Sequence, residues 1–439
     1  MHTGVSEDAP AALVPTGTSP HSYACIRSLH RQGVQTVVAS EREWVPQFAS
    51  RYCSERVRLD APPAEVSAYK EALLAVAERP SVEAVVPVRE HDAYVLARYA
   101  DEFAEVVGFV APDMATLERG QDRLELAAAA DSAGVPVAET RALSAVEDWD
   151  GDQVVKSRYN LLTPSYTDSV SPGRAEEVRS VCFLPAGVRP DVAALRARMR
   201  HDPIVQEYVP ESDRVCYSGL WVDGEPVSTY QHRQVRGNSW VGGGGVYRES
   251  VHVPAVESVA TDLLSELDWH GFACVEYLED ARTGEWKFVE INPRTWQSLP
   301  EAVRAGVDFP LHYWRRARGD TGPVDDTYAT GVGCHLSYGE VTHLLSVFRD
   351  ESPFAEPPSF ARRLREVVTS CVTEPRFDYL RADDPRWVVA AVRAGLSGDG
   401  DGDDGESGSR YGTVDPDVAE GDGGQSPSRP TASDGGRDR

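Results

Sequence analysis

The stretch that decides the fold reads Phe288-Val-Glu-Ile-Asn-Pro-Arg294. The apolar residues around Glu290 and Asn292 predict a β-strand, and residues two apart on a strand point to the same face. Their carboxylate and amide oxygens are hard ligands of the kind that Mg²⁺ prefers. Proline cannot continue a central ladder, so Asn-Pro is expected to end the strand. Arg294 then follows on the turn, within reach of the anions that such a metal would carry.

A second strand is predicted by Gly-Phe-Ala-Cys-Val-Glu-Tyr-Leu at 271–278, with Glu276 in its middle. Residues 279–284 predict a hairpin turn, since they include Asp280 and Gly284. Antiparallel pairing across this turn would bring Glu276 close to Glu290, and two carboxylates on one face repel each other unless a cation sits between them. The alternative is a solvated hairpin with scattered charges, which the Asn-Pro-Arg that follows fits poorly.

The length and the cysteines bound the class of protein. The chain has 439 residues, enough for two or three domains. No apolar run reaches the length of a membrane span, and the N-terminus lacks the basic and apolar regions of a signal peptide. The seven cysteines are scattered and contain no Cys-x-x-Cys pair. We therefore expect reduced, mostly buried thiols in a cytoplasmic protein without structural zinc.

The net charge of −26 is spread along the chain. Such an acidic surface should repel nucleic acid and anionic membranes, so neither is an expected partner. Only three lysines occur, at Lys70, Lys156 and Lys287. An acidic excess with few lysines is typical of salt-adapted, haloarchaeal proteins, although a GC-rich genome would also deplete lysine. Each remaining lysine raises the question of why arginine would not serve in its place.

The order of predicted elements indicates an α/β chain with several domains. A strand, a small-residue loop, a helix and a second strand open the sequence and predict a doubly wound domain over residues 1–112. Residues 113–330 mix helices and strands, and we divide them near 205 into two subdomains, 113–205 and 206–330. Residues 331–396 form a mixed, helical extension. Residues 397–439 are rich in Gly, Asp, Ser and Pro and are expected to be a disordered acidic tail.

Two further segments suggest a nucleotide site. Val-Val-Lys-Ser places Lys156 on an apolar strand, where an unpaired ammonium is costly and a phosphate would be a natural partner. The alternative is a structural lysine paired to a carboxylate. Downstream, a strand at 203–209 runs into a loop whose backbone could bind an adenine edge, and Asp213 could accept hydrogen bonds from ribose hydroxyls.

Taken in order, these residues resemble the ATP-grasp superfamily over residues 112–315, and the first domain resembles its pre-ATP-grasp domain. Glu-Ile-Asn-Pro-Arg is the most specific element. The segment Asn-Pro-Arg-Thr-Trp-Gln-Ser-Leu-Pro at 292–300, with Ala-Gly-Val-Asp-Phe-Pro at 305–310, is more narrowly similar to uncharacterised carboxylate–amine ligases, a group to which D-aspartate ligase is similar.

The resemblance implies a role for each matched residue. Lys156 and Arg123 would bind the ATP phosphates, and Arg294 would act near the transferred phosphate. Gln206 stands where a Glu often receives the adenine amino group, and Asp213 stands at the ribose position. The hinge that contacts the base would be Glu207, Tyr208 and Val209. The ligands of Mg²⁺ (or Mn²⁺), expected as two ions, would be Glu276, Glu290 and Asn292.

Some features depart from the family or stay open. No glycine follows Lys156 until Gly173, although many ATP-grasp enzymes have a glycine-rich loop there. The glycine run at 242–245 is either near the active site or a hairpin tip. Arg233 and Arg236 would contact the γ-phosphate or substrate, or form charge pairs. Ser19 and His21 would contact substrate, or mark a helix start.

The implied function is an ATP-dependent carboxylate–amine ligase that forms an acyl phosphate, which an amine attacks to give an amide, ADP and phosphate. Charge neutralisation matters more than a strong base in this chemistry. The alternatives are an ATP-binding module with a regulatory or other phosphoryl-transfer role, and a carbamoyl-phosphate-type carboxylation enzyme. Small-molecule carboxylates and amines are the expected partners, with a homodimer as a possible assembly.

Overall fold

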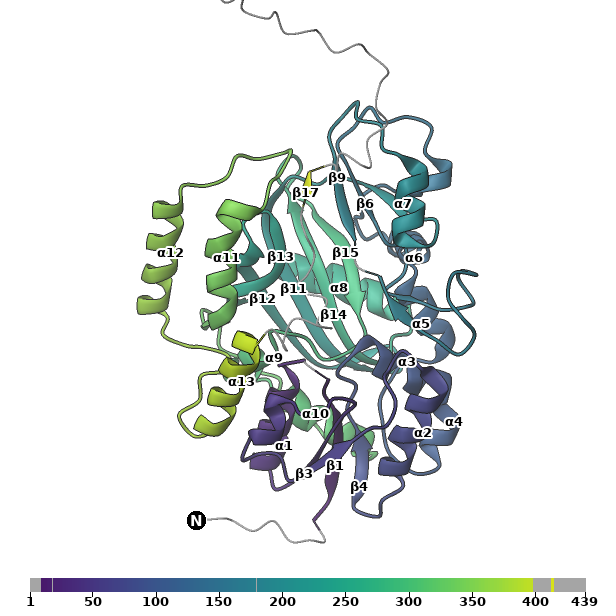
Figure 1. Ribbon diagram of the computed structural model, residues 1–439, viewed down its shortest axis with the longest axis vertical. Coiled ribbons are helices and arrows are strands. Elements are labelled where there is room, and N and C mark those ends of the chain that lie inside the picture. Colours follow the sequence, from purple (N-terminus) through teal and green to yellow (C-terminus); the bar gives the residue numbers. More distant parts are fainter. Residues whose placement is uncertain (1–8, 18, 179, 398–411, 414–439) are drawn as a thin grey trace, which may run out of the picture.

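The computed structural model describes residues 9–17, 19–178, 180–397 and 412–413 (Figure 1). The tail expected to be disordered, 397–439, lies almost wholly outside these residues. Within it, only Gly412–Thr413 (β17) and the last residue of a helix are described. Among the described helices, none has both the length and the hydropathy to cross a membrane.

The first part of the chain is a four-stranded parallel sheet in the order β3-β2-β1-β4. Its strands are β1 (Ala11–Pro15), β2 (Gln35–Ser40), β3 (Glu55–Arg58) and β4 (Val82–Val85). Alternation along β1 sends Val14 toward α1 (Ser22–Arg31) and Leu13 toward α2 (Val66–Ala77) and α3 (Glu90–Arg98). Helices therefore cover both faces, which confirms the predicted doubly wound architecture. The short elements η1 (Pro46–Ala49) and α4 (Ala100–Ala104) complete this layer.

A second sheet of five short strands, called the small sheet below, follows in the order β17-β9-β6-β10-β5. Its main strands are β5 (Thr140–Ala142), β6 (Gln153–Lys156), β9 (Val181–Leu184) and β10 (Ile204–Glu207). One face packs Val155 and Val205 against Leu195 and Met199 of α7 (Val192–Met199). The other face carries Lys156. The remaining elements of this region are α5 (Met114–Gln121), α6 (Arg123–Ser132), η2 (Leu143–Ala145), β7 (Leu161–Leu162) and β8 (Glu176–Glu177).

The third sheet is antiparallel, in the order β15-β14-β11-β12-β13-β16. Its strands are β11 (Glu211–Val222), β12 (Glu225–Ser239), β13 (Gly242–Val251), β14 (Gly271–Asp280), β15 (Trp286–Asn292) and β16 (Gly333–His335). One face packs on α8 (Pro254–Glu266) and α6 through Leu264, Tyr277 and Leu126. After β15, α9 (Leu299–Ala305) and α10 (Phe309–Ala317) pack back on the first sheet, where the Tyr313 hydroxyl donates to the carbonyl of Val85 at 2.8 Å.

The C-terminal extension contacts both the third sheet and the first domain. Its helices are α11 (Ser337–Arg349), α12 (Phe360–Thr373) and α13 (Pro385–Ser397). Helix α11 packs along β12 and β13. Helix α13 lies against the first domain, as Figure 1 shows, where Trp387 stacks on Tyr23 with 4.0 Å between ring centroids. The sequence of 331–396 does not show that this extension returns to the start of the chain.

Candidate active site between the small sheet and the third sheet

The hairpin predicted to carry the metal ligands, called the metal hairpin below, forms between β14 and β15. Strands β14 and β15 pair antiparallel, with Glu276 directly opposite Glu290. Strand β15 ends at Asn292, as Asn-Pro predicts, and Asn292 donates from Nδ2 to Glu290 Oε1 at 3.3 Å. The three oxygen-bearing side chains therefore share one face at one end of the hairpin. Their oxygens are the donor set that Mg²⁺ prefers, so these residues fit a divalent metal.

Arg123 begins helix α6 and reaches across to this face. Its Nη2 donates to Glu290 Oε2 at 2.8 Å, and its Nη1 donates to the carbonyl of Ser157 at 3.0 Å. Asp122 caps the same helix by accepting from the amide of Leu124 at 2.9 Å. The cap fixes where the helix starts and so holds the guanidinium between the small sheet and the metal hairpin.

Lys156 projects from β6 toward the same carboxylates. Within the described residues it has no carboxylate at ion-pair distance, whereas Lys70 contacts Glu71 and Glu102 and Lys287 contacts Glu207 and Asp280. Lys156 keeps part of its surface accessible, yet protein atoms around it withdraw it from bulk water. This burial, together with the nearby Arg123 guanidinium, lowers its pKa to about 8 despite Glu290 and Glu276. The alternative of a lysine paired to a carboxylate is therefore not what the structure shows.

Glu290 is the electrostatic counterpart of Lys156. Burial by itself would raise the pKa of this carboxyl, but Arg123, Lys156 and Asn292 outweigh that effect and lower the pKa to about 2. Glu290 is therefore ionised at every working pH, and Arg123 and Lys156 balance its charge.

Arg214 also lies at this site, and sequence reasoning missed it. Its Nη1 lies 3.4 Å from Glu276 Oε2, and its Nη2 lies 2.8 Å from Glu211. Strand β11 is the second neighbour of β14, with Cys216 paired to Glu276. Only that pairing register shows which residue of β11 approaches the metal carboxylates, and an isolated sequence does not contain it.

The residues predicted to bind the nucleoside lie together at the end of β10. Gln206 donates from Nε2 to Thr140 Oγ1 at 2.8 Å, and Glu207 is paired with Lys287 at 3.2 Å. The amide of Tyr208 donates to the carbonyl of Asp152 at 2.9 Å, and Val209 is buried. Their roles toward adenine stay predictions.

A cavity of about 370 Å³ adjoins the start of β11. Asp213, Arg214, Arg233, Gly242 and Arg363 are among its lining residues. Asp213 is paired with Arg233 at 2.8 Å, so the charge-pair alternative holds for Arg233, although both side chains border the cavity. The ribose role of Asp213 stays a prediction. The glycine run at 242–245 begins β13 directly after the hairpin turn at Trp240 and Val241 and borders the cavity at Gly242, and its role near an active site stays a prediction.

Arg236 forms an ion pair with Glu340 on α11. Its Nε and Nη2 donate to Glu340 at 2.8 and 3.0 Å, and Nη2 also donates to Ser370 Oγ at 2.7 Å. The side chain is buried. The charge-pair alternative therefore describes Arg236 better than substrate binding does.

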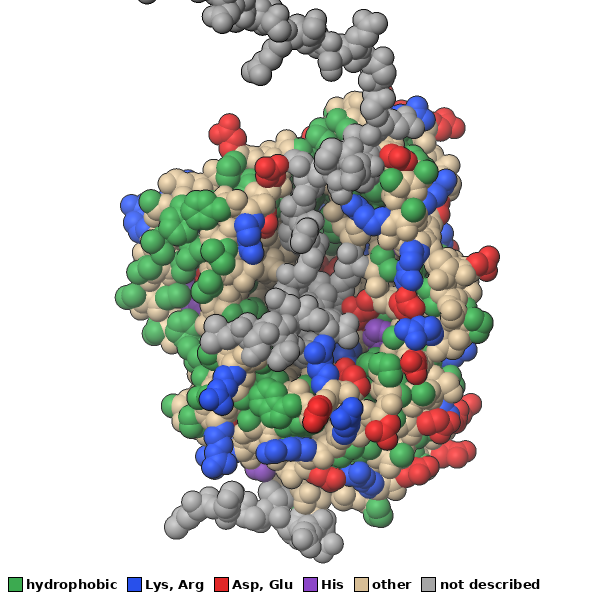
Figure 2. Space-filling view, viewed as in Figure 1, with side chains coloured by type: hydrophobic (Ala, Val, Ile, Leu, Met, Phe, Trp, Pro, Cys, Tyr) green, Lys and Arg blue, Asp and Glu red, His purple; other side chains and the backbone are tan. Residues whose placement is uncertain are grey.

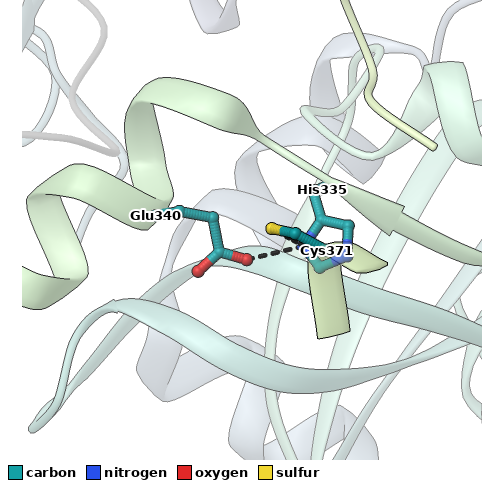
Figure 3. A group of neighbouring side chains, drawn as sticks. All are labelled: His335, Glu340 and Cys371. Carbon is teal, nitrogen blue, oxygen red and sulfur yellow. Dashed lines mark hydrogen bonds and ion pairs between the residues drawn. The ribbon is translucent and has the colours of Figure 1, made fainter. Parts of the chain in front are cut away.

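Glu340 belongs to a group of possible metal ligands with His335 and Cys371 (Figure 3). His335 Nδ1 lies 2.7 Å from Glu340 Oε1 and 3.9 Å from Cys371 Sγ. Arg236 already neutralises Glu340, however, so a metal would compete with a buried, bidentate guanidinium. We interpret this group as an ion-pair network that fastens α11 and α12 to β16.

The other predicted residues lie at the first domain. Arg294 is buried, and its Nε lies 3.2 Å from Glu90 Oε1 at the start of α3. Ser19 and His21 are buried too: the Ser19 carbonyl accepts from Gln47 Nε2 at 3.0 Å, and His21 Nε2 lies 3.0 Å from the Val88 carbonyl. These contacts agree with a packed helix start. The substrate roles of Ser19 and His21 stay predictions.

A scan against protein-family models gives no match, and a search of curated proteins gives none either. Solved structures do match. An N5-carboxyaminoimidazole ribonucleotide synthetase in its ADP complex is similar over 84% of this chain and 98% of that chain, with a TM-score of 0.54 and 14% identity.

Two other similar solved structures are of different enzymes. The biotin carboxylase domain of 2-oxoglutarate carboxylase from Hydrogenobacter thermophilus, solved with MgADP, ADP and bicarbonate, matches over 74% of this chain and 73% of that chain, with a TM-score of 0.53 and 16% identity. L-amino acid ligase from Bacillus licheniformis matches over 71% and 74%, with a TM-score of 0.50 and 13% identity. All three are ATP-grasp enzymes. At these identities the likeness shows the fold, and this α/β chain has the ATP-grasp fold with a doubly wound N-terminal domain.

Proposed function

We propose that this protein is an ATP-dependent carboxylate–amine ligase. In this reaction the γ-phosphoryl group of ATP passes to a carboxylate oxygen of one substrate. The amine of a second substrate then attacks the acyl phosphate, which gives an amide, ADP and phosphate. The substrates would be small molecules in the cytoplasm.

The observation that carries the proposal is Lys156. Its ammonium is withdrawn from water beside Arg123 and lacks a paired carboxylate among the described residues, so its positive charge is costly until an anion arrives. Glu276, Glu290 and Asn292 face it from the neighbouring sheet. Cations on one side and metal-binding oxygens on the other are the arrangement that a metal-bound polyphosphate requires.

Different residues of the site would bind the metal, the phosphates and the nucleoside. Glu276, Glu290 and Asn292 would hold Mg²⁺ or Mn²⁺, which when bound neutralises phosphate oxygens. Arg123, now paired with Glu290, would share its donors with phosphate together with Lys156. The residues from Gln206 to Asp213 would bind the nucleoside. Arg294 would stabilise negative charge at the transferring group, while Glu90 fixes its direction.

The acceptor carboxylate has a candidate position in the cavity beside Arg214 and Arg233. At about 370 Å³ the cavity is large enough for a small ligand, and arginine side chains suit a carboxylate. Arg214 also links the cavity to Glu276, which places the cavity next to the metal hairpin.

The test is ADP release from Mg-ATP, measured in high salt because of the acidic surface. Amino acids are supplied singly and in pairs, and bicarbonate is supplied in a separate arm. Release only with a carboxylate–amine pair supports the ligase. Tight ATP binding without release for any pair would support the ATP-binding module, and release with bicarbonate alone would support carboxylation.

A matched pair of variants tests the metal assignment. Glu290→Gln removes the ionised ligand and is expected to lower ADP release at least about 100-fold, the scale of losing one major electrostatic contact to the transferring group. Glu285→Gln changes the same residue type at an exposed position of the same hairpin and should leave the rate unchanged. Full activity of Glu290→Gln would rule out the assigned metal site.

A further inference from the structure

A loop of the C-terminal extension places an aromatic ring against the small sheet. Phe354 lies between α11 and α12 and stacks on Tyr208, with 3.9 Å between centroids and an interplanar angle of 26°. It also meets Phe183 edge-on, at 5.9 Å and 89°. Phe183 and Tyr208 are themselves 6.2 Å apart at 85°. Three rings from three segments therefore meet at one place.

The strand register puts the ring of Phe183 on the face of the small sheet that carries Lys156. Phe183 pairs with Val154, and Lys156 lies two residues further along β6, on the same face. The opposite face is filled by the packing of Val155 and Val205 on α7. Because Lys156 faces Glu290, the face that carries Phe183 is turned toward the third sheet.

The same register separates a row for the base from a row for the phosphates. Gln206 pairs with Val154, so Gln206, Val154 and Phe183 form one row across three strands. The next row on this face contains Lys156, about 7 Å further along the strand. If Lys156 holds phosphate, the row beside the three rings is where the base of the same nucleotide would lie.

The loop that carries Phe354 is fastened to the third sheet. Its first residue, Asp350, accepts from Ser239 Oγ at 2.6 Å, and its carbonyl accepts from Trp240 Nε1 at 3.0 Å. Ser239 and Trp240 form the tip between β12 and β13. Phe354 therefore spans from the third sheet to the small sheet, at the end of the third sheet where the β14–β15 turn also lies.

We propose that Phe354, from the C-terminal extension, presents the ring face turned away from Tyr208 as a surface on which the adenine base stacks. This inference rests on the proposed function and deepens it. Every nucleobase has a π-face that stacks on aromatic rings, and a rigid phenyl group offers such a surface at little conformational cost. The alternative is a purely structural role, in which Phe354 only anchors its own loop.

The experiment separates the base from the phosphates. Binding of Mg-ATP and of Mg-tripolyphosphate, which has no base, is measured for wild type, Phe354→Ala, Phe354→Leu and Phe354→Trp. We expect both Ala and Leu to weaken Mg-ATP about 10-fold and to leave tripolyphosphate within about twofold, while Trp retains ATP affinity. Phe354→Leu keeps an apolar side chain and guards against misfolding. Phe348→Ala removes the same ring from an exposed position of α11, 70% accessible, and should change neither ligand.

The outcomes distinguish this inference from the proposed function. Unchanged Mg-ATP binding in Phe354→Ala, or an equal loss for both ligands, would overturn the stacking role while leaving the ligase proposal intact. A wild-type protein that binds neither ligand would overturn both.

Discussion

At the scale of residues, the ammonium group of Lys156 is buried beside another cation, Arg123. Its pKa of about 8 lies below the usual lysine range because burial and Arg123 disfavour the charged form. Arginine would stay charged at all working pH values, and most cations of this protein are arginines. A lysine with a pKa of about 8 can lose its charge near neutral pH, so its protonation should affect the binding of an anionic ligand.

This setting predicts the pH dependence of nucleotide binding. Below pH 8 the free protein carries the charged ammonium that attracts phosphate, and above pH 8 it progressively loses it. The Kd for Mg-ATP should therefore rise by up to about tenfold per pH unit between pH 8 and 10, as measured by calorimetry. In Lys156→Arg the charge does not titrate, so its profile should be flat over this range. An equal slope in both proteins would show that another group is responsible.

The limits of sequence reasoning are also visible at single residues. The spacing from Gln206 to Asp213 points to Asp213, but Asp213 and its neighbour Arg214, which both border the cavity, have different ion-pair partners. Asp213 pairs with Arg233, and Arg214 approaches Glu276. Which of two adjacent residues faces a site depends on strand pairing, and a linear motif cannot specify it.

At the scale of elements, three segments far apart in sequence meet at a buried guanidinium. Arg248 on β13 contacts Asp378 and lies 3.2 Å from Glu301 on α9. All three side chains are almost fully buried. One cation thus faces two carboxylates, and burial, reinforced by Asp378, raises the pKa of Glu301 to about 8 despite Arg248.

The raised pKa of Glu301 has a consequence for stability. Between the unfolded pKa of about 4.5 and the folded pKa of about 8, only the folded state holds this proton, so the free energy of unfolding falls as pH rises. Glu301→Gln removes this dependence. Relative to wild type it should become more stable by more than about 1 kcal/mol at pH 8 and differ little at pH 5, measured by urea unfolding. Glu266→Gln, exposed on α8, is the control and should show no such trend. A constant difference between pH 5 and 8 would contradict the assignment.

At the scale of the whole molecule, α11 and α12 present an apolar face (Figure 2). On α12 an exposed stripe recurs every four residues, and α11 adds a second stripe. The exposed residues are Phe360, Leu364, Val368 and Val372 on α12, and Tyr338, Val341, Leu345 and Phe348 on α11. Exposed apolar patches of this kind mark interaction sites.

A second copy of the chain fits this face better than the chain's own end does. Residues 398–439 contain only Tyr411, Val414 and Val418 as large apolar side chains, too few to cover eight. Two such helix pairs related by a twofold axis can pack as four helices. The homodimer expected from the sequence stays a prediction, and this face is its proposed surface.

Light scattering tests the assembly. Wild type should have about twice the chain mass of 48.0 kDa, and Val368→Glu should have the mass of one chain. Val106→Glu, which changes an exposed valine of the first domain, should remain dimeric. A wild-type mass of one chain at micromolar concentration would exclude the dimer.

The sequence by itself determined the local arrangement of the predicted metal ligands. Glu290, Asn292 and the following Pro lie within five residues, and local pleating is enough to predict their common face and the end of their strand. The β14–β15 hairpin and the doubly wound first domain were predictable for the same reason, because local patterns and short connections encode them, whereas the ATP-grasp fold was predicted from a resemblance to a known family.

Only the tertiary structure decided which distant residues meet there. Arg123 on Glu290, Arg214 beside Glu276, Glu90 on Arg294 and Phe354 over Tyr208 all join segments separated by tens of residues or more. The course of residues 331–396 belongs to this class too. These contacts depend on strand register and on how whole elements pack, and those follow from burial summed over the entire chain and from no local pattern.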